Sequence, residues 1–405
     1  MRREQQLTQT LKDIVVADFS HVMAGPYASH LLRLLGATVI KIEEPTHGDA
    51  MRYYGEDRRY DGMAPAFIGV NAGKKSIALD LKDAAQLETA RQIIQRSDVL
   101  LENFRPGVMA RLGLDYEAVR KLNPKIIYCS VSGYGQTDSE QRDWPAIDNI
   151  VQATSGMMSL GGELGDPPVR VGFPVVDTLT GQTAAFAILA ALLRRERSGG
   201  SEFIDVAMLD ATLAFMTSAI VPFLVTGKAL PRTGNVGYSG QPTSGLFETS
   251  DGKKISLGVV RQKQFASLAK YLDRPQWLED PRFINPEQRR KHSAELQVEL
   301  SEVLKARPAA EWESEMSAAG IPCGMVREVS EAAQFPHLAG RRLKLPLTVP
   351  GLPDREQVEI VNAGFLMTED GPGVDDPPPL LNQHQEEILQ WLRGEELRVV
   401  RDGHS

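Results

Sequence analysis

The stretch VRVGFPVVDTLTG, residues 169–181, contains one carboxylate, Asp177, between apolar, glycine-spaced residues and a following run of small and apolar residues. No Ser, Cys or His stands beside it, and no GxSxG elbow occurs in the chain, so a Ser-His-Asp or Cys-His system is poorly supported. Asp177 is then either the N-cap of the helix predicted to follow it or a catalytic carboxylate without such partners. Capping residues are common and nucleophiles are rare, so the pattern alone favours the cap.

The histidines and cysteines do not predict a metal site. There is no HExxH motif, and the histidines show no metal-ligand spacing. They are His21, His30, His47, His292, His337, His384 and His404. The two cysteines, Cys129 and Cys323, lie far apart and form no CxxC motif, so we expect two reduced thiols and neither a zinc cluster nor a disulfide.

The composition is typical of an enzyme-sized globular chain. Its 405 residues predict two or three domains, and 45 basic against 53 acidic residues give a formal net charge of −8. Because the basic residues are scattered, we expect no nucleic-acid partner. The start, MRREQQLTQTLKD, lacks the apolar core of a secretion signal, which predicts a cytoplasmic protein. The most apolar segment, LDATLAFMTSAIVPFLVTG, is interrupted by polar residues and a proline, which predicts a buried helix and no membrane anchor.

Alternating apolar runs and helical patterns predict the fold class. IVVADFS (14–20) and TVIKIEE (38–44) are typical of strands, and the Gly25-Pro26 turn and a helix ending at Leu35 between them complete a βαβ unit. The alternation continues through SIALDL (76–81), DAAQLETARQIIQRS (83–97), DVLLENF (98–104), DYEAVRKLN (115–123) and IIYCSVSGYG (126–135). We therefore predict an α/β fold with a doubly wound, mainly parallel, Rossmann-like sheet.

Changes in residue composition along the chain predict the domain boundaries. Residues 1–226 form the first part of a large domain, which continues through the helix GQTAAFAILAALLRRE and the strand EFIDVAML. From Gly227 a Gly, Pro and Ser-rich segment leads into polar helical patterns, which predicts a smaller α/β domain over 227–335. The β-like LKLPLTV and REQVEIV and a last helix, QHQEEILQWL, are expected to return to the large domain over 336–405.

Two groups of residues stand near strand ends, where open α/β sheets bind ligands. The first turn, SHVMAGPYAS, lacks the GxGxxG spacing of a dinucleotide site, so NAD is not supported, although a helix N-terminus still offers free N–H groups to a ligand. Basic residues near other strand ends, Lys74, Lys75, Arg105 and Arg111, suit a phosphate-bearing ligand. Solvated surface charge explains any single one of them equally well.

Taken together, these segments resemble the class III CoA-transferase family, also called the CaiB/BaiF or formyl-CoA transferase family. The resemblance is collinear over almost 400 residues and rests on the order of several loose motifs. The resembling segments are SHVMAGPYASHLLRLLGATVIKIEEP with GDAMR, VNAGKKSIALDLK, DVLLENFRPGVMARLGL, IIYCSVSGYGQT, IDNIVQATSGMM, GDPPVRVGFPVVDTLTG and PPPLLNQHQEEIL.

The resemblance implies a large domain built from both chain ends, a small domain between them, and an interlocked homodimer. It implies that Asp177 is the catalytic aspartate, which forms an aspartyl-CoA thioester and so needs no Ser, Cys or His. Coenzyme A and acyl-CoA are then substrates, together with a small carboxylic acid, and no tightly bound cofactor is expected. In the family a glycine-rich loop shields the intermediate, and here the matching stretch, GYSGQP, has only Gly237 and Gly240.

The CoA contacts of the family carry over by position. They fall on Val22, Met23, Ala24, Lys74, Asn103, Phe104 and Arg111. Two departures concern the acid: Met23 stands where formyl-CoA transferase-like members have Gln, and Glu44 stands where they have a basic residue. These departures argue against oxalate as the acceptor. For the acceptor carboxylate, Arg52, Arg170 and Tyr238 are candidates among which no spacing argument selects.

Three functions remain open from the sequence. The leading hypothesis is a CoA-transferase with a dicarboxylate such as succinate as donor or acceptor. The second is an α-methylacyl-CoA racemase, which in this family pairs the Asp with a His of a GHD motif thirty positions earlier. Here 177 − 30 = 147, and Ile147 occupies that position, so one of the two bases is missing. The third is a CoA-binding protein without turnover.

Overall fold

The computed structural model describes residues 10–369 and 371–397. The chain divides into two compact units. Unit 1 consists of Met1–Met157, Arg170–Gly227 and Pro336–Ser405, and unit 2 of Met158–Val169 and Lys228–Phe335. The first nine residues, His404 and the rest of the tail after 397 lie outside the described residues.

The sheet of unit 1 has six parallel strands in the order β3-β2-β1-β4-β5-β6. These are β1 (Val15–Asp18), β2 (Thr38–Glu43), β3 (Lys75–Ala78), β4 (Val99–Glu102), β5 (Ile127–Ser132) and β6 (Glu202–Ala207). The predicted parallel sheet is therefore confirmed. From β1 the chain winds outward to β3, and from β4 it winds the other way to β6, so the winding direction reverses between β1 and β4. Ligands of open α/β sheets bind beyond the strand ends at such a switch point.

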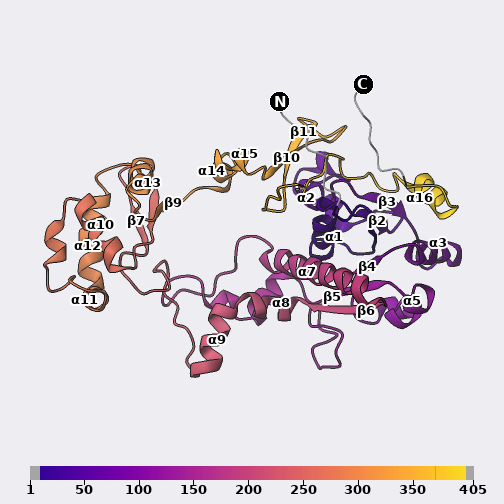
Figure 1. Ribbon diagram of the computed structural model, residues 1–405, viewed down its shortest axis with the longest axis horizontal. Helices are drawn as coiled ribbons and strands as arrows, with labels where there is room; N and C mark the ends of the chain where they lie inside the picture. The colour runs from indigo at the N-terminus through magenta and orange to yellow at the C-terminus, as the bar shows by residue number, and fades with distance from the viewer. Residues whose placement is uncertain (1–9, 370, 398–405) are drawn as a thin grey trace. The chain divides into compact units, whose positions relative to one another are not determined.

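Helices cover both faces of this sheet because its strands are apolar on both sides. On one face, α1 (Ala24–Leu34) and α7 (Val175–Ser198) pack on strand residues such as Val16 and Leu101. On the other face, α3 (Ala84–Gln95), α5 (Tyr116–Leu122) and α16 (Gln385–Leu392) pack on residues such as Ala17 and Leu100. Figure 1 shows α7 running beside β5 and β6.

The two helices α1 and α7 approach each other closely at Gly181. A Cβ atom at this position would stand 2.6 Å from the backbone oxygen of Ala24, so a larger residue would force the helices apart. This contact matters because α1 carries the turn that follows β1 and α7 carries Asp177.

Three predicted helix boundaries are wrong. Helix α1 begins at Ala24, so Gly25-Pro26 lies inside its first turn and does not precede it. Helix α7 begins at Val175, with Pro174 as its N-cap, so Asp177 lies inside the helix and the cap interpretation is excluded. The segment predicted as one buried helix forms α8 (Met208–Phe215) and α9 (Thr217–Thr226), bent by 78°, and α9 has no buried residue.

One helix, α7, is long and apolar enough to span a membrane by length and composition. Half of its most apolar window is buried, and it packs on α1, β5 and β6. Its buried apolar residues, among them Ala184 and Ile188, therefore belong to the core of unit 1.

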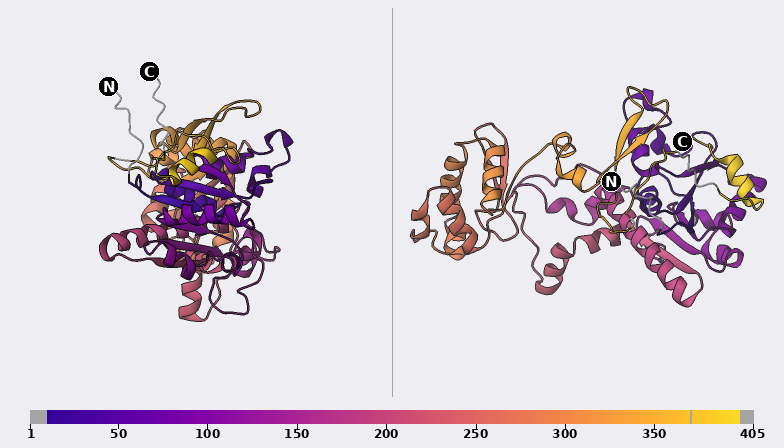
Figure 2. Two further views of the ribbon diagram at one scale, coloured as in Figure 1. Left: turned by 90° about the vertical axis from the view of Figure 1, so that its right-hand side faces the viewer. Right: turned by 45° about the horizontal axis from the view of Figure 1, so that its top comes forward.

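The remaining elements of unit 1 surround the sheet. They are 3₁₀ turns at Ala50–Tyr53 and Arg58–Tyr60, α2 (Pro65–Asn71), α4 (Val108–Arg111), α6 (Asp148–Thr154), α15 (His337–Gly340), and the antiparallel pair β10 (Lys344–Thr348) and β11 (Gln357–Val361). The C-terminal segment binds edge strand β3, since Asn382 Oδ1 accepts from the Ala78 amide and the His384 amide donates to the Ser76 carbonyl. Figure 2 shows α16, in yellow, beside the N-terminal elements.

Unit 2 has its own small sheet and core. Its antiparallel strands are β7 (Leu246–Glu248), β8 (Lys254–Leu257) and β9 (Cys323–Met325). Its helices are α10 (Gln262–Tyr271), α11 (Pro286–Lys291), α12 (Ser293–Leu304), α13 (Ala309–Ala318) and α14 (Val329–Ala332), with 3₁₀ turns at Met157–Ser159, where the units meet in sequence, and Pro275–Leu278. They enclose a buried cluster around Phe265 and Trp277.

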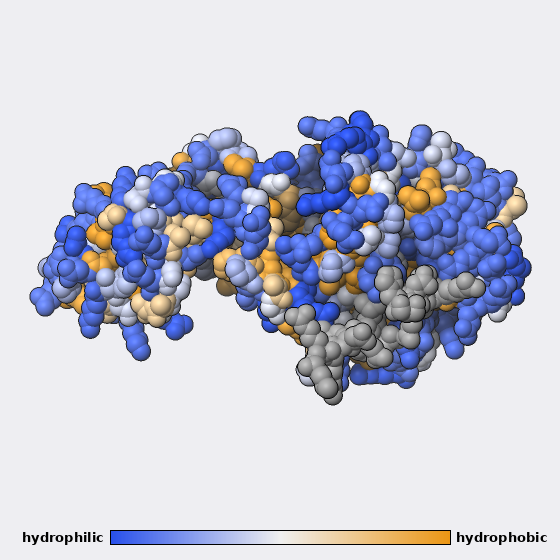
Figure 3. Space-filling model, turned by 90° about the horizontal axis from the view of Figure 1, so that it is seen from above, coloured by the Kyte–Doolittle hydropathy of each residue, from blue (hydrophilic) through white to orange (hydrophobic). Residues whose placement is uncertain are grey.

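On the face shown in Figure 3, hydrophilic residues predominate and hydrophobic residues form small groups.

Candidate functional site

The turn after β1 and the turn after β4 are joined at the switch point of the sheet. Asn103, which follows β4, accepts a hydrogen bond from the His21 amide at 2.9 Å and donates its own Nδ2 to the His21 carbonyl at 2.8 Å. The His21 ring lies against Phe104, with 5.4 Å between ring centroids. One side chain thus holds the two turns in register.

Buried charged groups hold the turn after β1 in place. The Val22 amide donates to the Asp49 carboxylate at 3.0 Å, and Asp49 in turn pairs with the Lys41 ammonium at 2.9 Å. Lys41 also donates to the Ser20 carbonyl. Burial by itself would raise the pKa of Asp49, but the Lys41 charge and the backbone donors hold it below its usual value. The turn is therefore anchored by an ionised pair and does not rest on packing alone.

Val22 has a strained backbone conformation. Its φ of 66° lies in the left-handed region, which a β-branched residue rarely adopts. Such strain costs roughly 1–3 kcal/mol and persists only where surrounding contacts enforce it. Here the Asp49 contact enforces it, and the strained residue lines the cavity described next.

A cavity of about 520 Å³, called here the Asp177 cavity, opens at the switch point within unit 1. The structure brings five of the sequence-predicted residues together with Asp177 in its wall: Val22, Met23, Ala24, Asn103 and Phe104. The wall of this cavity also contains His21, Arg105, Arg142, Asp148 and Arg170.

Asp177 occupies the first turn of α7, and a second carboxylate holds that turn. Asp148, the first residue of α6, accepts hydrogen bonds from the amides of Val176 at 2.7 Å and Asp177 at 3.2 Å, and its other oxygen accepts from Gln152 at 2.6 Å. The Asp177 side chain itself caps nothing. Burial, and secondarily the Asp148 charge, raise the pKa of Asp177 to about 7. The pKa of this carboxyl group therefore lies near neutral pH, and no cation among residues 10–369 and 371–397 lowers it.

A second cavity of about 450 Å³, the Lys82 cavity, adjoins the first, because both include His21 and Phe104 in their walls. It is mainly apolar, with Ile42, Leu79, Leu81, Val108 and Leu112 in its lining and Lys82 at its edge. Sequence reasoning missed Lys82, although LDLK directly follows β3 and the carboxyl end of a strand was a usable signal.

The structure does not bring Lys74 to either cavity. Its ammonium group is fully buried, 3.2 Å from the Asp18 carboxylate and 2.9 Å from the Pro26 carbonyl. Burial lowers the pKa of Lys74 to about 8 despite the Asp18 charge. Arg111 is exposed on α4, the helix whose Val108 lines the Lys82 cavity. The position of Lys74 next to a strand in the sequence suggested a ligand contact. In the fold, Lys74 instead forms a buried ion pair with Asp18.

The three candidates for the acceptor carboxylate separate clearly. Arg52 is buried against Glu43 at 2.7 Å and lies 4.0 Å over the Phe67 ring, so its charge is already paired inside the fold. Arg170 is exposed and lines the Asp177 cavity. Tyr238 belongs to unit 2 and is 81% exposed, and Gly237 and Gly240 belong to the same unit.

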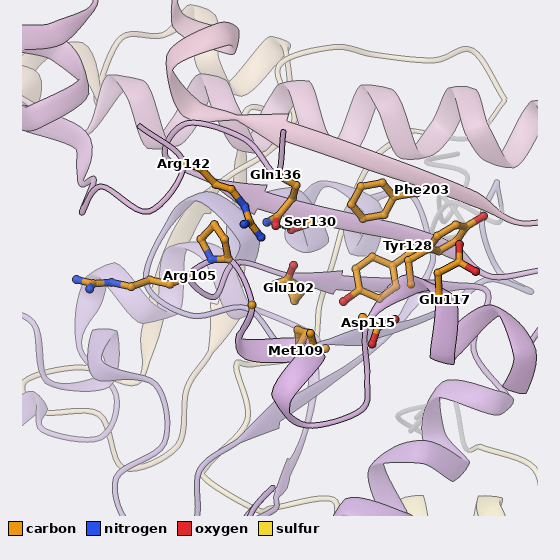
Figure 4. A pocket seen from close by; sticks show the side chains of 14 residues that line it. Glu102, Arg105, Met109, Asp115, Glu117, Tyr128, Ser130, Gln136, Arg142 and Phe203 are labelled. Carbon is orange, nitrogen blue, oxygen red and sulfur yellow. Dashed lines mark hydrogen bonds between the residues drawn. The ribbon is translucent and has the colours of Figure 1, made fainter. Parts of the chain in front are cut away.

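Figure 4 shows a third, smaller cavity of about 260 Å³, the Glu102 cavity. It adjoins the Asp177 cavity, because both include Arg105, Pro106 and Arg142 in their walls. Glu102 stands at the end of β4, where its carboxyl group accepts from the Phe104 amide at 2.8 Å. Burial raises the pKa of Glu102 to about 7. Among residues 10–369 and 371–397 no group of three His, Cys, Asp or Glu side chains is arranged to hold a metal ion.

Comparison with known proteins identifies the family of the chain. The family model of CoA-transferase family III matches residues 11–385. The chain is 39% identical to the acetyl-CoA:oxalate CoA-transferase of Acetobacter aceti, covering 84% of this chain and 87% of that protein. It is 32% identical to the succinyl-CoA–D-citramalate CoA-transferase of Chloroflexus aurantiacus, covering 96% of both.

A solved structure gives the same result. The crystal structure of a CAIB/BAIF family protein from Brucella suis superposes with a TM-score of 0.85 at 29% identity, covering 96% of this chain and all of that one. The fold, the family model and the curated relatives agree over nearly the whole length. The chain therefore belongs to CoA-transferase family III and is an acyl-CoA:carboxylate CoA-transferase.

Proposed function

We propose that the protein moves CoA between an acyl-CoA and a free carboxylic acid through an aspartyl-CoA thioester on Asp177. The observation that carries this proposal is a single carboxylate with a pKa of about 7 in the wall of the Asp177 cavity. At neutral pH about half of such a group is ionised and able to attack a carbonyl carbon. Its desolvation makes that carboxylate more reactive than one in water.

The reaction conserves the free energy of the thioester by passing it through an activated acyl intermediate at each step. The Asp177 carboxylate attacks the donor thioester carbonyl, and the C–S bond breaks to give a mixed anhydride and CoA thiolate. The thiolate then attacks the Asp177 carbonyl carbon of the anhydride, which forms the aspartyl-CoA thioester and releases the donor acid as its carboxylate. The acceptor carboxylate repeats these two steps in reverse, so Asp177 is regenerated without net uptake of water or a proton.

The first turn of α1 supports these steps electrostatically. Met23 and Ala24, at the N-terminus of this helix, line the same cavity as Asp177. A helix N-terminus presents unpaired amide donors and a partial positive charge, which stabilise the oxyanions formed at each carbonyl. The strained Val22 and its Asp49 contact set the direction in which this turn faces.

The two adjoining cavities suit the two ends of an acyl-CoA. The apolar Lys82 cavity matches an adenine ring, with Lys82 and Arg111 available for phosphates, and the thioester end then reaches Asp177 past His21 and Phe104. This placement replaces Lys74 by Lys82 as the lysine that contacts CoA, because only Lys82 is exposed.

The acids named for the relatives support a dicarboxylate as donor or acceptor. Oxalate, citramalate and succinate, the parent acid of the succinyl group, each carry two carboxyl groups. We propose a dicarboxylate such as succinate, and since a relative named for oxalate shares 39% identity, oxalate belongs in the screen although Met23 and Glu44 argue against it.

An α-methylacyl-CoA racemase is the second candidate, favoured by one observation. No histidine stands at position 147, but His21 lines the Asp177 cavity and offers a different second base. Burial lowers the pKa of His21, so it is neutral at pH 7 and able to accept a proton. Exchange of the α-proton of a 2-methylacyl-CoA with deuterated water would support this function.

We propose that the protein acts as a cytoplasmic homodimer, interlocked as the family resemblance implies. The exposed apolar residues of α8 and α9, among them Phe215, Phe223, Leu224 and Val225, support association with a second copy. Light scattering after size-exclusion chromatography would measure the mass of the assembly, and a monomer at micromolar concentration would contradict the proposal.

The covalent intermediate tests the main proposal directly. The protein is incubated with succinyl-CoA and then analysed by intact and peptide mass, before and after treatment with hydroxylamine. We expect a hydroxylamine-sensitive CoA or acyl adduct on the peptide containing Asp177, and none in the Asp177→Asn variant. Absence of the adduct with a panel of acyl-CoAs, together with α-proton exchange, would move the racemase to first place.

A further inference from the structure

Arg142 stands at the junction of the Glu102 cavity and the Asp177 cavity, since it lines both. Figure 4 shows its guanidinium group pointing toward Ser130, Gln136 and Glu102. Arg105 also lines both cavities, but its side chain points away from the other labelled groups. Arg142 is therefore the arginine whose charge is directed into the space between the two cavities.

The charge of Arg142 has no compensation in the part of the chain that the structure describes. Its Nε atom is buried and has no hydrogen-bond partner there. No carboxylate among residues 10–369 and 371–397 forms an ion pair with its guanidinium group. Arginine stays protonated in proteins, and the Arg142 side chain is partly buried. An anion that binds beside it forms the charge-assisted hydrogen bonds that its buried Nε atom lacks.

Glu102 is not that anion. Its carboxyl group already accepts from the Phe104 amide and from the Ser130 side chain. Burial raises its pKa to about 7, so a substantial fraction is neutral at physiological pH. Ser130 in turn accepts a hydrogen bond from Gln136 at 3.0 Å. These groups form a polar wall of the Glu102 cavity and leave the Arg142 charge for a ligand.

The location of Arg142 selects the kind of anion. The wall of the Lys82 cavity, where the proposed function places the phosphates of CoA, does not include Arg142. Arg142 instead shares a cavity with Asp177, where the acyl group and the acceptor acid react. The planar guanidinium group matches a carboxylate, with which it forms two parallel hydrogen bonds.

We propose that Arg142 determines substrate choice by binding the remote carboxylate of a dicarboxylic acid whose other carboxyl group exchanges CoA at Asp177. This inference rests on the proposed function. Arg170 lines the same cavity but is exposed, so water screens its charge and its contribution is smaller.

The test measures binding without turnover, in an Asp177→Asn background saturated with CoA. Calorimetry gives the Kd of succinate and of butyrate, which has the same number of carbon atoms and one carboxylate. We expect Arg142→Gln to weaken succinate binding by about tenfold or more. Butyrate binding should change less than twofold. Arg142→Lys keeps the charge without the planar fork and should fall between the two.

Arg105→Gln is the matched control, because Arg105 lines the same two cavities but points away. We expect less than a twofold change in succinate binding for this variant. Circular dichroism and the Tm of each variant establish that it is folded. An equal loss of succinate and butyrate binding would overturn the inference, as would weaker binding of CoA itself, which would assign Arg142 to a phosphate.

The outcome separates this inference from the proposed function. The adduct on Asp177 in the wild-type protein reports the transfer chemistry, whereas binding to the Asp177→Asn protein reports Arg142 alone. If the adduct forms but no dicarboxylate of two to six carbons binds better than a monocarboxylate, the inference is wrong and the proposed chemistry stands. If no adduct forms but the selective loss appears, the proposed chemistry fails and the carboxylate site remains.

Discussion

The Asp148 carboxylate accepts hydrogen bonds from the backbone amides of Val176 and Asp177, at 2.7 and 3.2 Å. One acidic residue thus caps the helix that carries another. The first effect is geometric, because it fixes the first turn of α7. The second is electrostatic, because a like charge nearby disfavours ionisation of Asp177.

Asp148→Asn should shift the acid limb of the pH profile to lower pH. Asp177 has to be ionised to attack a thioester, so activity rises as the pH passes its pKa of about 7. Asparagine keeps an oxygen that accepts from the two amides but removes the charge that raises this pKa. The measurement is kcat/KM for CoA transfer between pH 5 and 9. Asp143→Asn, an exposed change in the same segment, should leave the midpoint unchanged, and an unchanged midpoint in Asp148→Asn would refute the electrostatic effect.

Asp177→Asn should abolish transfer and stabilise the fold above neutral pH. Loss of a nucleophile lowers kcat by about a thousandfold or more. The folded protein binds a proton at Asp177 up to about pH 7, whereas the unfolded chain releases it near 3.8, so stability falls as the pH rises between these values. The substitution removes this loss, which is at most about 4 kcal/mol and smaller where water reaches the group.

Thermal unfolding at pH 4 and pH 8 checks the second part. We expect Asp177→Asn to raise the Tm at pH 8 by about 3 °C or more and to leave it nearly unchanged at pH 4. An equal shift at both pH values would show that the effect does not arise from the ionisation of Asp177.

Glycine and alanine at position 22 should differ in stability. Both remove the Val22 side chain and keep the amide that donates to Asp49, but only glycine adopts a φ of 66° without strain. Val22→Gly should therefore be more stable than Val22→Ala by about 1 kcal/mol. Urea denaturation of the two variants gives this difference, and a more stable alanine variant would contradict the left-handed conformation.

Substitutions of Lys74 and Lys82 should have opposite effects on the stability of the fold and on CoA binding. Lys74→Met leaves Asp18 buried without its cation and should destabilise the fold by about 3–5 kcal/mol. Lys82→Met changes an exposed residue, so stability should stay within about 0.5 kcal/mol. CoA binding should weaken by about threefold to tenfold in Lys82→Met. Calorimetric titration with CoA and thermal unfolding distinguish the two roles, and normal CoA affinity in Lys82→Met would place the phosphates elsewhere.

The sequence by itself determined the parallel sheet and the family. Apolar runs at regular spacing allow little besides parallel strands covered on both faces, so IVVADFS and TVIKIEE formed β1 and β2 within two residues of their predicted bounds. The order of the motifs carried the resemblance to the family, which the family model over residues 11–385 confirms. Strand positions depend on the local sequence, and the family resemblance depends on the order of the motifs, so both can be predicted from the linear sequence.

Only the tertiary structure decided which charged residues line a cavity and which form ion pairs inside the fold. Lys74 and Arg52 are basic residues of the kind that bind anionic ligands. The fold, however, places Asp18 and Glu43 within ion-pair distance of them, and both pairs are buried. Lys82 and Arg142 carry no motif, and the roles proposed for them follow from cavities that distant segments form together. The pKa of Asp177 depends in the same way on Asp148, 29 positions away and brought close by α6 and α7. Burial and pairing are properties of three-dimensional neighbours, which the linear pattern does not contain.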